Sequence, residues 1–285
     1  MSVVICGAHT YLGSRLFDRL SSDGMTVSAL SEYSPRITRH TIDEGDTVVY
    51  LDDYSGHGVY KSVYSHVTGL SAVIDICRIK NASRIIYGSS YRVYGRNVYI
   101  PVYEHDTKMP FDLYGLTKMW GEDLLYESCG ITDDERSFPF TVLRFSKVYG
   151  PGCRDGFIFD TMKSVLESVN PPVYFGEQTR DFIYVDDAVD ALCLILNNGK
   201  IRSNRVGAFN IGSGSEISLN SLASKIIELC GVDGVEVSET THDLGVWIDY
   251  PRMRLNLDKI DMYGWKPKVS LDDGLREVYE WMSKT

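Results

Sequence analysis

Tyr114 and Lys118 are the two side chains whose types and spacing most directly suggest acid–base chemistry in this sequence. Pro110 and Asp112 precede them in the manner of a helix start, and apolar residues then recur at helical spacing. The phenol and the ammonium are therefore expected one turn apart on one helix face. An unperturbed phenol titrates near pH ~10, and a cation a few ångströms away favours its phenolate. The pair could act as a general base or acid near neutral pH, although the same spacing is also common on solvated helix faces.

The N-terminal segment predicts the first element that could position this pair. Ser2 to Cys6 is an apolar strand pattern, the turn from Gly7 to Gly13 is rich in small residues, and helical periodicity follows from Ser14. A strand, a glycine turn and a helix in this order can hold a dinucleotide, because small residues let the backbone approach a pyrophosphate at the helix N-terminus. Thr10 stands where a third glycine would allow the closest approach, so a plain tight turn remains the alternative.

The choice between NAD and NADP rests on the end of the second predicted strand, Thr26 to Leu30. An acid placed there would accept hydrogen bonds from the adenosine ribose hydroxyls. Ser31 cannot do this, although Glu32 could, and Arg36 or Arg39 could instead meet a 2′-phosphate. Both cofactors stay open at this point.

Only sixteen residues lie between Leu30 and the next strand, Thr47 to Leu51. A parallel crossover usually takes a dozen residues or more, so the sheet is expected to be trimmed here. The strand ends in Asp52 and Asp53, for which a solvated turn is the simpler interpretation.

A long helix is then expected over 59–80, and a strand over 84–88 leads into Ser89 and Ser90. These serines end a strand on the sheet edge that the Tyr114 helix should border, where α/β folds place ligands. Buried hydroxyls at such an edge also often serve only to satisfy backbone groups.

Length and composition exclude several classes of protein. The chain has 285 residues, 44% hydrophobic and 24% charged, which describes a globular protein, and it holds no apolar run of the ~20 residues that a membrane span needs. The strand pattern at the N-terminus leaves no room for a secretory signal. Six scattered cysteines without a CxxC pair suggest neither a disulfide framework nor a metal site, so we expect a reducing, cytoplasmic setting. A net charge of −10 disfavours nucleic acid and anionic membranes as partners.

The pattern changes after a strand over 141–146. Residues 153–179 and 201–265 are richer in turns and short segments, and helices are expected near 157–168, 219–230 and 271–283. We therefore expect a nucleotide-binding domain over 1–152 and about 181–200, and a smaller lobe over 153–180 and 201–285.

Seven motifs follow one another over nearly the full length: Gly7-x-x-Thr-Tyr-Leu-Gly13, Ser89-Ser90-x-x-Val-Tyr-Gly95, Tyr114-x-x-x-Lys118, Leu143-Arg-Phe-x-x-Val-Tyr-Gly-Pro151, Arg180-Asp-Phe-Ile-Tyr-Val-Asp186, Phe209-Asn-Ile-Gly212, and Leu257-Asp-Lys with Gly264-Trp-x-Pro267. Together they resemble the extended short-chain dehydrogenase/reductase family, which comprises nucleotide-sugar epimerases, dehydratases and 4-keto reductases. The resemblance implies an α/β fold, a Rossmann-type doubly wound parallel sheet with a smaller C-terminal substrate-binding lobe. It also implies a homodimer through the helices at 59–80 and 112–129.

The resemblance also implies roles for individual residues. Tyr114 would be the acid/base, Lys118 would hold the nicotinamide ribose and lower the pKa of Tyr114, and Ser90 would bind the reacting sugar oxygen. The implied cofactor contacts, to NAD or NADP, are Gly7, Thr10, Tyr11, Leu12, Gly13, Ser31, Glu32, Leu51, Tyr114 and Lys118. The implied contacts to a nucleoside-diphosphate sugar are Ser89, Ser90, Lys147, Arg180, Arg252 and Arg254. Lys147 departs from the family, which commonly has an Asn there.

Three reactions are compatible with such a site in principle. A 4,6-dehydratase would need an Asp-Glu pair directly after the serine, where this chain has Tyr91 and Arg92. A 4-epimerase needs only Ser90, Tyr114 and Lys118, and it is the reading we favour. An NADPH-dependent 4-keto reductase needs the same three residues and is the alternative, while a non-catalytic NAD(P)-binding module is a more remote one. Cys153 or Lys147 could add C3/C5 epimerisation, but a packed thiol and a surface amine explain them more simply.

Overall fold

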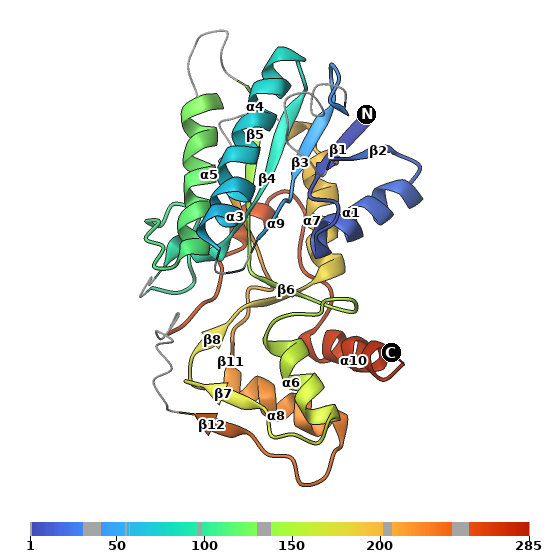
Figure 1. Ribbon diagram of the computed structural model, residues 1–285, viewed down its shortest axis with the longest axis vertical. Coiled ribbons are helices and arrows are strands. Elements are labelled where there is room, and N and C mark those ends of the chain that lie inside the picture. Colours follow the sequence, from blue (N-terminus) through green and yellow to red (C-terminus); the bar gives the residue numbers. More distant parts are fainter. Residues whose placement is uncertain are drawn as a thin grey trace.

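A six-stranded parallel sheet forms the centre of the larger part of the molecule (Figure 1). The computed structural model describes residues 2–30, 41–54, 56, 58–95, 99–129, 138–201, 207–240 and 251–284. The strands run in the order β10-β5-β4-β3-β1-β2, and every neighbouring pair is parallel. Their bounds are β1 Ser2–Cys6, β2 Thr26–Leu30, β3 Thr47–Tyr50, β4 Arg84–Ser90, β5 Phe140–Phe145 and β10 Ala208–Ile211. The predicted Rossmann-type sheet is confirmed.

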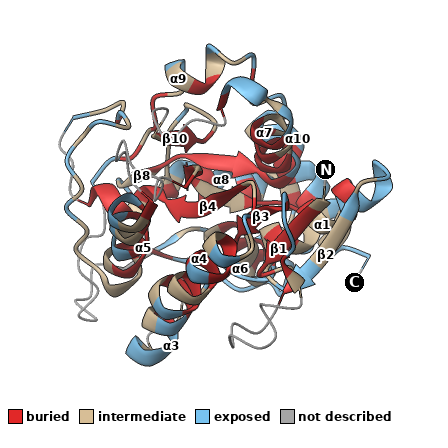
Figure 2. Cartoon of the chain, turned by 90° about the horizontal axis from the view of Figure 1, so that it is seen from above, coloured by how far each residue is buried: buried red, intermediate tan, exposed pale blue. Residues whose placement is uncertain are grey.

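Alternation along the strands divides the core into two layers. Val3 and Ile5 pack with α1 (Tyr11–Ser22) and α7 (Val185–Asn197) on one face. Val4 and Cys6 pack with α4 (Gly69–Ile79) and α5 (Leu113–Cys129) on the other. Successive residues of a strand point to opposite faces, so a sheet covered by helices on both sides needs apolar residues at nearly every position. Figure 2 shows this as buried strands between partly exposed helices.

The helix predicted over 59–80 contains a π-helical turn. It consists of α3 (Val59–Val63), the π turn η1 (Tyr64–Thr68) and α4. The phenol of Tyr50, at the end of β3, donates a hydrogen bond to the carbonyl of Ser65 at 2.6 Å. This contact ties the π turn to the carboxyl edge of the sheet and buries Ser65 and His66 beside it.

One edge of the sheet agrees with the prediction from the sequence, and the other edge differs from it. β2 is the last strand in the described sheet, in line with a trimmed edge. Ser31, Glu32, Arg36 and Arg39 lie outside the described residues, so the connection that follows β2 stays a prediction. At the other edge, residues 208–211 were expected in the smaller lobe but form β10, which pairs with β5. In the sequence, this short apolar run looks like the other short segments of the lobe. Only its pairing with β5 in the structure shows that it belongs to the central sheet.

The smaller part of the molecule has a core of its own. Its helices α6 (Phe157–Leu166), α8 (Leu219–Cys230) and α10 (Leu271–Met282) share buried apolar side chains with β7 (Pro172–Tyr174). Its other strands are β8 Thr179–Arg180, β11 Ile217–Ser218 and β12 Ser238–Thr240, while β6 (Lys147–Tyr149) pairs with β9 (Phe182–Tyr184) at the junction of the two parts (Figure 1). The remaining short elements are η2 Tyr91–Tyr94, η3 Gly199–Ile201 and α9 Asp258–Asp261. We propose to keep the division into a nucleotide-binding domain and a smaller lobe, with one change. β10 and α9, which pack together, then belong to the domain of the central sheet.

All six cysteines carry free thiols. In the described parts of the chain, no helix combines the length and the apolar character that a membrane span requires. Within the same residues, no group of three or more His, Cys, Asp or Glu side chains could hold a metal ion.

Candidate active site

A cavity of about 380 Å³ opens at the carboxyl edge of the sheet. Its walls come from the turn after β1, the ends of β3, β4 and β5, the first turns of α5, and β6 with the loop that follows it. Chain segments far apart in sequence therefore converge on one space. The predicted residues that line it are Thr10, Tyr11, Leu12, Leu51, Ser89, Ser90, Tyr114, Lys118 and Lys147.

The glycine turn is built closely against the end of β3. Gly7 has a φ of +87°, and a Cβ there would lie 2.4 Å from the amide nitrogen of Asp52. A Cβ on Gly13 would lie 2.1 Å from the carbonyl oxygen of Gly7. Both positions require glycine, since no side chain fits either space.

Thr10 completes this turn. Its hydroxyl donates to the Gly7 carbonyl at 2.8 Å and accepts from the Gly13 amide at 3.1 Å, so it is the N-cap of α1. The N-terminus of α1 consequently faces the cavity through Tyr11 and Leu12. A helix N-terminus behind a tight turn is the arrangement that receives a dinucleotide pyrophosphate, so these residues fit that group.

Tyr114 and Lys118 lie one turn apart on α5 and both face the cavity, as the sequence predicts. Lys118 is buried, donates to the carbonyl of Gly88 at 3.0 Å, and holds its ammonium 5.7 Å from the centre of the Tyr114 ring. Glycine lets α5 approach the sheet, because a Cβ on Gly121 would lie 2.4 Å from the Tyr87 hydroxyl. The close approach brings the ammonium under the sheet edge.

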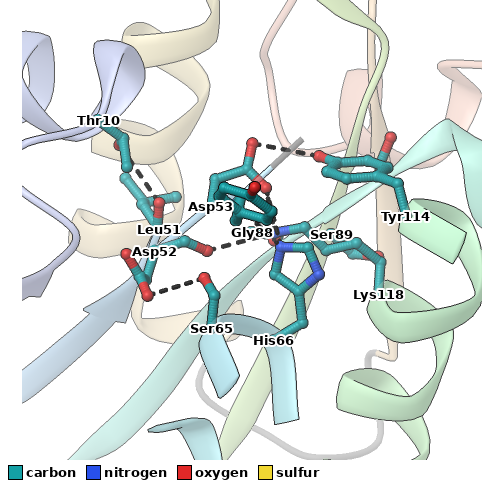
Figure 3. Close-up of polar contacts among 12 residues, drawn as sticks. Thr10, Leu51, Asp52, Asp53, Ser65, His66, Gly88, Ser89, Tyr114 and Lys118 are labelled. Atoms are coloured by element: carbon teal, nitrogen blue, oxygen red, sulfur yellow. Dashed lines mark hydrogen bonds and ion pairs between the residues drawn. The ribbon is translucent and has the colours of Figure 1, made fainter. Parts of the chain in front are cut away.

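Asp53 joins the two residues (Figure 3). One carboxylate oxygen, Oδ1, lies 3.2 Å from Lys118 Nζ and 3.1 Å from His66 Nε2, and the other, Oδ2, accepts a hydrogen bond from the Tyr114 hydroxyl at 3.3 Å. Burial raises the pKa of Asp53, but the Lys118 charge and the His66 contact outweigh it and hold that pKa below its usual range. Asp53 is therefore an anion at neutral pH.

The interpretation of Asp52 and Asp53 as a solvated turn is wrong. Asp52 is buried and accepts a hydrogen bond from Ser65 at 2.8 Å. Asp53 keeps 38% of its side chain exposed towards the cavity, but its carboxylate is engaged by three side chains. The pairing depends on α5 and the π turn, which the strand sequence alone does not contain.

The electrostatics of Tyr114 also differ from the expectation. Lys118 was expected to lower the pKa of Tyr114, yet its ammonium is paired with Asp53. Burial and the Asp53 carboxylate raise the pKa of Tyr114, against an opposing effect of Arg92. In this structure Tyr114 is a neutral phenol that donates its proton to a hydrogen bond.

His66 lies fully buried behind Asp53. Burial and the Lys118 charge lower the pKa of His66 to about 4, so the imidazole is neutral at pH 7. Its Nδ1 lies 2.8 Å from the hydroxyl of Thr117, which itself donates to the Leu113 carbonyl at 2.9 Å. Its Nε2 faces both Asp53 and the backbone amide of Tyr54, at 3.1 and 3.2 Å. Nε2 cannot serve both neighbours at once, because the carboxylate requires a hydrogen-bond donor and the amide requires an acceptor.

The two serines at the end of β4 have different surroundings. Ser90 lines the cavity, and its hydroxyl accepts from the backbone amide of Arg92 at 3.3 Å, which begins η2. Ser89 also borders the cavity, but its hydroxyl donates to Glu122 at 2.5 Å. The Ser90 hydroxyl therefore accepts one hydrogen bond from the backbone. The Ser89 hydroxyl instead donates its proton to a buried carboxylate.

Glu122 belongs to a second charged cluster, one turn further along α5. Arg144 of β5 binds it through two hydrogen bonds, Nε to Oε1 at 2.9 Å and Nη2 to Oε2 at 2.7 Å. The same guanidinium donates to the Tyr94 hydroxyl at 2.9 Å, which in turn donates to Asn210 at 2.5 Å. We call Ser89, Tyr94, Glu122, Arg144 and Asn210 the closed cluster, and Asp53, His66, Tyr114, Thr117 and Lys118 the open cluster.

Residues proposed for additional chemistry or substrate contact are distributed unevenly. Lys147 and Cys153 line the cavity. The Cys153 thiol donates to Asp155 at 3.3 Å, and burial raises its pKa to about 11, so it does not offer a thiolate base.

The three predicted arginines do not line this cavity. Arg180 is buried on β8 and donates to the Thr179 carbonyl at 2.7 Å and to Gln178. Arg252 is exposed and paired with Glu216. Arg254 accepts through its carbonyl from the Val102 amide at 2.8 Å.

Comparison with known proteins identifies the chain's relatives. The model of the NAD dependent epimerase/dehydratase family matches residues 3–212. A protein of Methanocaldococcus jannaschii, provisionally named a UDP-glucose 4-epimerase, is 27% identical over 98% of both chains. UDP-glucuronate 4-epimerase 1 of Arabidopsis thaliana is 30% identical over 77% of this chain and 53% of its own length. Human dTDP-D-glucose 4,6-dehydratase is 26% identical over 80% of this chain and 65% of its own.

Solved structures share the fold over the whole chain. MoeE5 in complex with UDP-glucose and NAD has a TM-score of 0.87 at 25% identity, covering 100% of this chain and 99% of MoeE5. UDP-glucose 4-epimerase of Thermotoga maritima with UDP-glucose has a TM-score of 0.85 at 24% identity, with the same coverage.

Proposed function

This chain belongs to the NAD dependent epimerase/dehydratase family, and from that premise we propose that it is a nucleoside-diphosphate-sugar 4-epimerase that works with tightly held NAD. One observation carries the proposal. Ser90, Tyr114 and Lys118 share the wall of a single cavity whose opposite side is the capped glycine turn. A sugar 4-hydroxyl and a nicotinamide can therefore be held side by side, without any further acid or base.

The chain's own residues account for the proton movements. Tyr114, once ionised to the phenolate, accepts the proton of the sugar 4-hydroxyl and returns it after the sugar has turned, so one side chain serves both directions. Ser90 donates a hydrogen bond to the sugar 4-oxygen, and Lys118 holds the nicotinamide ribose. NAD, when bound, supplies the site that takes the hydride from C4 and gives it back, so that a 4-keto sugar stands between the two epimers.

Dehydration is disfavoured by the residues that follow Ser90. Tyr91 is packed in a small apolar cluster with Val102 and Met253, and Arg92 is paired with Asp112 at 2.7 Å. Neither can remove a C5 proton or protonate a leaving C6 hydroxyl as a carboxylic acid would. The chain is thus similar to the human dehydratase over 80% of its length, but it has no Asp-Glu pair directly after Ser90.

The relatives support a choice of cofactor and of reaction type. The family is described as NAD dependent, and the MoeE5 structure contains NAD. The relative that matches 98% of both chains is named an epimerase. These findings support NAD and epimerisation over NADPH and 4-keto reduction.

Substrate contacts both in the cavity wall and outside it are part of the proposal. Lys147 offers a cation to the substrate from the cavity wall, and a diphosphate is the group that Arg180, Arg252 and Arg254 would bind. UDP-sugars are the substrates named for the epimerases among the relatives, so UDP is the nucleotide we propose.

A homodimer through α5 and the segment made of α3, η1 and α4 is also proposed. These helices lie side by side in Figure 1 and carry exposed apolar residues, among them Val59, Tyr60, Tyr64, Trp120 and Tyr126. Burying such side chains would favour a two-helix contact from each copy. We propose a cytoplasmic location, where the six free thiols would stay reduced.

The test is Tyr114→Phe, which keeps the ring and removes the titrating hydroxyl. Turnover of UDP-glucose or UDP-glucuronate, followed by chromatography of the epimers, should fall about 10²–10⁴-fold. The control is Tyr103→Phe, an exposed phenol outside the cavity, which should retain turnover. Epimers should form without net absorbance change at 340 nm. Stoichiometric NADPH consumption with a 4-keto sugar would instead identify a reductase, and unchanged turnover in Tyr114→Phe would remove the assignment of the base.

A further inference from the structure

Asp53 touches both residues of the catalytic pair and has no part in the chemistry described above. Its Oδ2 accepts from the Tyr114 hydroxyl at 3.3 Å, and its Oδ1 lies 3.2 Å from Lys118 Nζ. A carboxylate in this place changes the charge that Tyr114 experiences, because it cancels the ammonium one turn away.

The backbone around Asp53 fixes the carboxylate in this position. The preceding Leu51 amide donates to the Cys6 carbonyl at 2.8 Å, and the following Tyr54 amide donates to His66 Nε2 at 3.2 Å. Asp52, the residue directly before Asp53, turns the other way and accepts from Ser65. The two adjacent carboxylates therefore point to different partners, and only Asp53 reaches Tyr114 among the pair (Figure 3).

Groups from four further places surround the Tyr114 ring. The Arg92 guanidinium lies 5.4 Å from its centre and is itself paired with Asp112. The His66 ring meets it edge to face at 5.3 Å and is neutral. The ionisable and charged neighbours are thus Asp53 at the end of β3, His66 on η1, Tyr87 on β4, Arg92 on η2 and Lys118 on α5.

Among these neighbours, Asp53 makes the direct contact with the phenol oxygen. Arg92 favours a phenolate, but Asp112 offsets its charge. Lys118 would favour a phenolate as well, but Asp53 offsets it. Deprotonation of Tyr114 would place two negative oxygens about 3.3 Å apart, which both the Coulomb repulsion and the lost hydrogen bond oppose.

We propose that Asp53 is a positioning residue that keeps Tyr114 protonated and thereby sets the pH above which this site can take the proton of a substrate hydroxyl. The proposal rests on the proposed function, because it gives Tyr114 the role of the base. The direction agrees with the pKa of Tyr114, which burial and Asp53 raise. The site should consequently work best on the alkaline side of neutrality, and Asp53 should be the reason.

The experiment compares Asp53→Asn with Asp52→Asn, which neutralise adjacent carboxylates of the same strand end. Tyrosine labelled with ¹³C at Cζ reports phenol ionisation by NMR, and the Tyr114 signal is the one that Tyr114→Phe removes. In the protein as purified, Asp53→Asn should move the ionisation of Tyr114 down by about one to three pH units. Asp52→Asn should leave it in place, because that carboxylate contacts Ser65 instead.

A second pair of variants protects the test against a folding defect. Asp53→Glu keeps the charge and should titrate like the unaltered protein, whereas Asp53→Ala should shift in the same direction as Asp53→Asn. A Tyr114 titration that stays unchanged in both neutral variants, or that moves equally in Asp52→Asn, would overturn the proposal.

Kinetics then distinguish this proposal from the proposed function. The acid limb of the pH profile of kcat/KM should move to lower pH in Asp53→Asn by the same amount as the NMR titration. An NMR shift without any epimerase activity would retain the role of Asp53 and reject the proposed function. A kinetic loss at all pH values without an NMR shift would assign Asp53 a purely structural role and reject the present proposal.

Discussion

The closed and the open cluster contact the same helix, α5, one turn apart, at Glu122 and Lys118, and their contacts differ in kind. In the closed cluster, Glu122 and Arg144 are almost fully buried, at 0% and 4% exposure, and meet through two parallel hydrogen bonds. Burial raises the pKa of Glu122, but Arg144 outweighs it and lowers it. Ser89 also donates to Oε1 of Glu122, and the Lys108 ammonium lies 3.3 Å from Oε2, so every partner of this carboxylate is a donor.

In the open cluster, partners compete. Lys118 and His66 share one oxygen of Asp53, and His66 Nε2 has a carboxylate and an amide on the same side. The contacts of Asp53 measure 3.1 to 3.3 Å, longer than the 2.7 to 2.9 Å of the Glu122–Arg144 pair. Asp53 also keeps 38% of its side chain open to the cavity. A buried cluster whose polar groups all have matching partners stabilises the fold. A cluster that is open to the cavity on one side can exchange its partners for a ligand.

Arg144→Met should have the largest effect on stability. It leaves Glu122 buried without its main partner, and breaking one half of a buried pair costs about 3–5 kcal/mol. Urea unfolding measures the loss, and turnover per folded molecule should change little. Arg252→Met, which breaks an exposed pair with Glu216, is the control and should lie within about 1 kcal/mol of the unaltered protein. A loss of less than about 1 kcal/mol in the unfolding free energy of Arg144→Met would mean that the closed cluster does not stabilise the fold.

The second prediction concerns acid and the open cluster. The pKa of His66 is about 4 in the folded protein against a usual 6.5, so the unfolded chain binds the proton first as pH falls. Stability should therefore be retained above about pH 6.5 and decrease from there towards pH 4, by about 3 kcal/mol in total. Below this window the lowered pKa of Asp53 continues the loss.

Unfolding free energies measured at several pH values test this sign. His66→Asn should flatten the slope between pH 6.5 and 4, whatever its effect at pH 7. A slope that persists in the variant would assign the acid sensitivity to other groups.

The smallest effect on stability is expected for Lys118→Met, although it removes a buried charge. Its partner Asp53 can turn to the cavity and be solvated, so we expect a loss of about 1 kcal/mol or less in urea unfolding. Epimerase activity should be lost at the same time. If Lys118→Met destabilises as strongly as Arg144→Met, the distinction between the two clusters fails.

Much of this arrangement could be predicted from local sequence. The strand, turn and helix from Ser2 onwards have short-range signals, and four-residue spacing places Tyr114 and Lys118 on one face of α5. The glycine turn was anticipated with Thr10 as a defect, whereas the structure shows its hydroxyl as the helix cap. Ser, Thr and Asn side chains are preferred in that role, so the residue types already contained this signal.

The partners of Asp53 could not be predicted in this way. His66 belongs to no motif, and its meeting with Asp53 and Thr117 joins three separate elements. The arginines illustrate the same limit. The family resemblance implied that Arg252 binds a diphosphate, but in this structure it is paired with Glu216, the residue directly before β11. A long side chain selects its partner from what folding brings within reach.

The π turn η1 has a consequence for the evolution and engineering of this helix. A π turn holds one residue more than the α-helical turn it replaces, so it behaves as a single-residue insertion within the run from Val59 to Ile79. Deleting that residue would restore a regular helix, but it would rotate everything on one side of the deletion by about 100° relative to the other. Either the buried His66 would leave the sheet edge, or Leu70 and Val73 would leave the core. The length of this segment thus couples the face that holds His66 against Asp53 to the face packed in the core, and shortening it by one residue should disrupt one of the two.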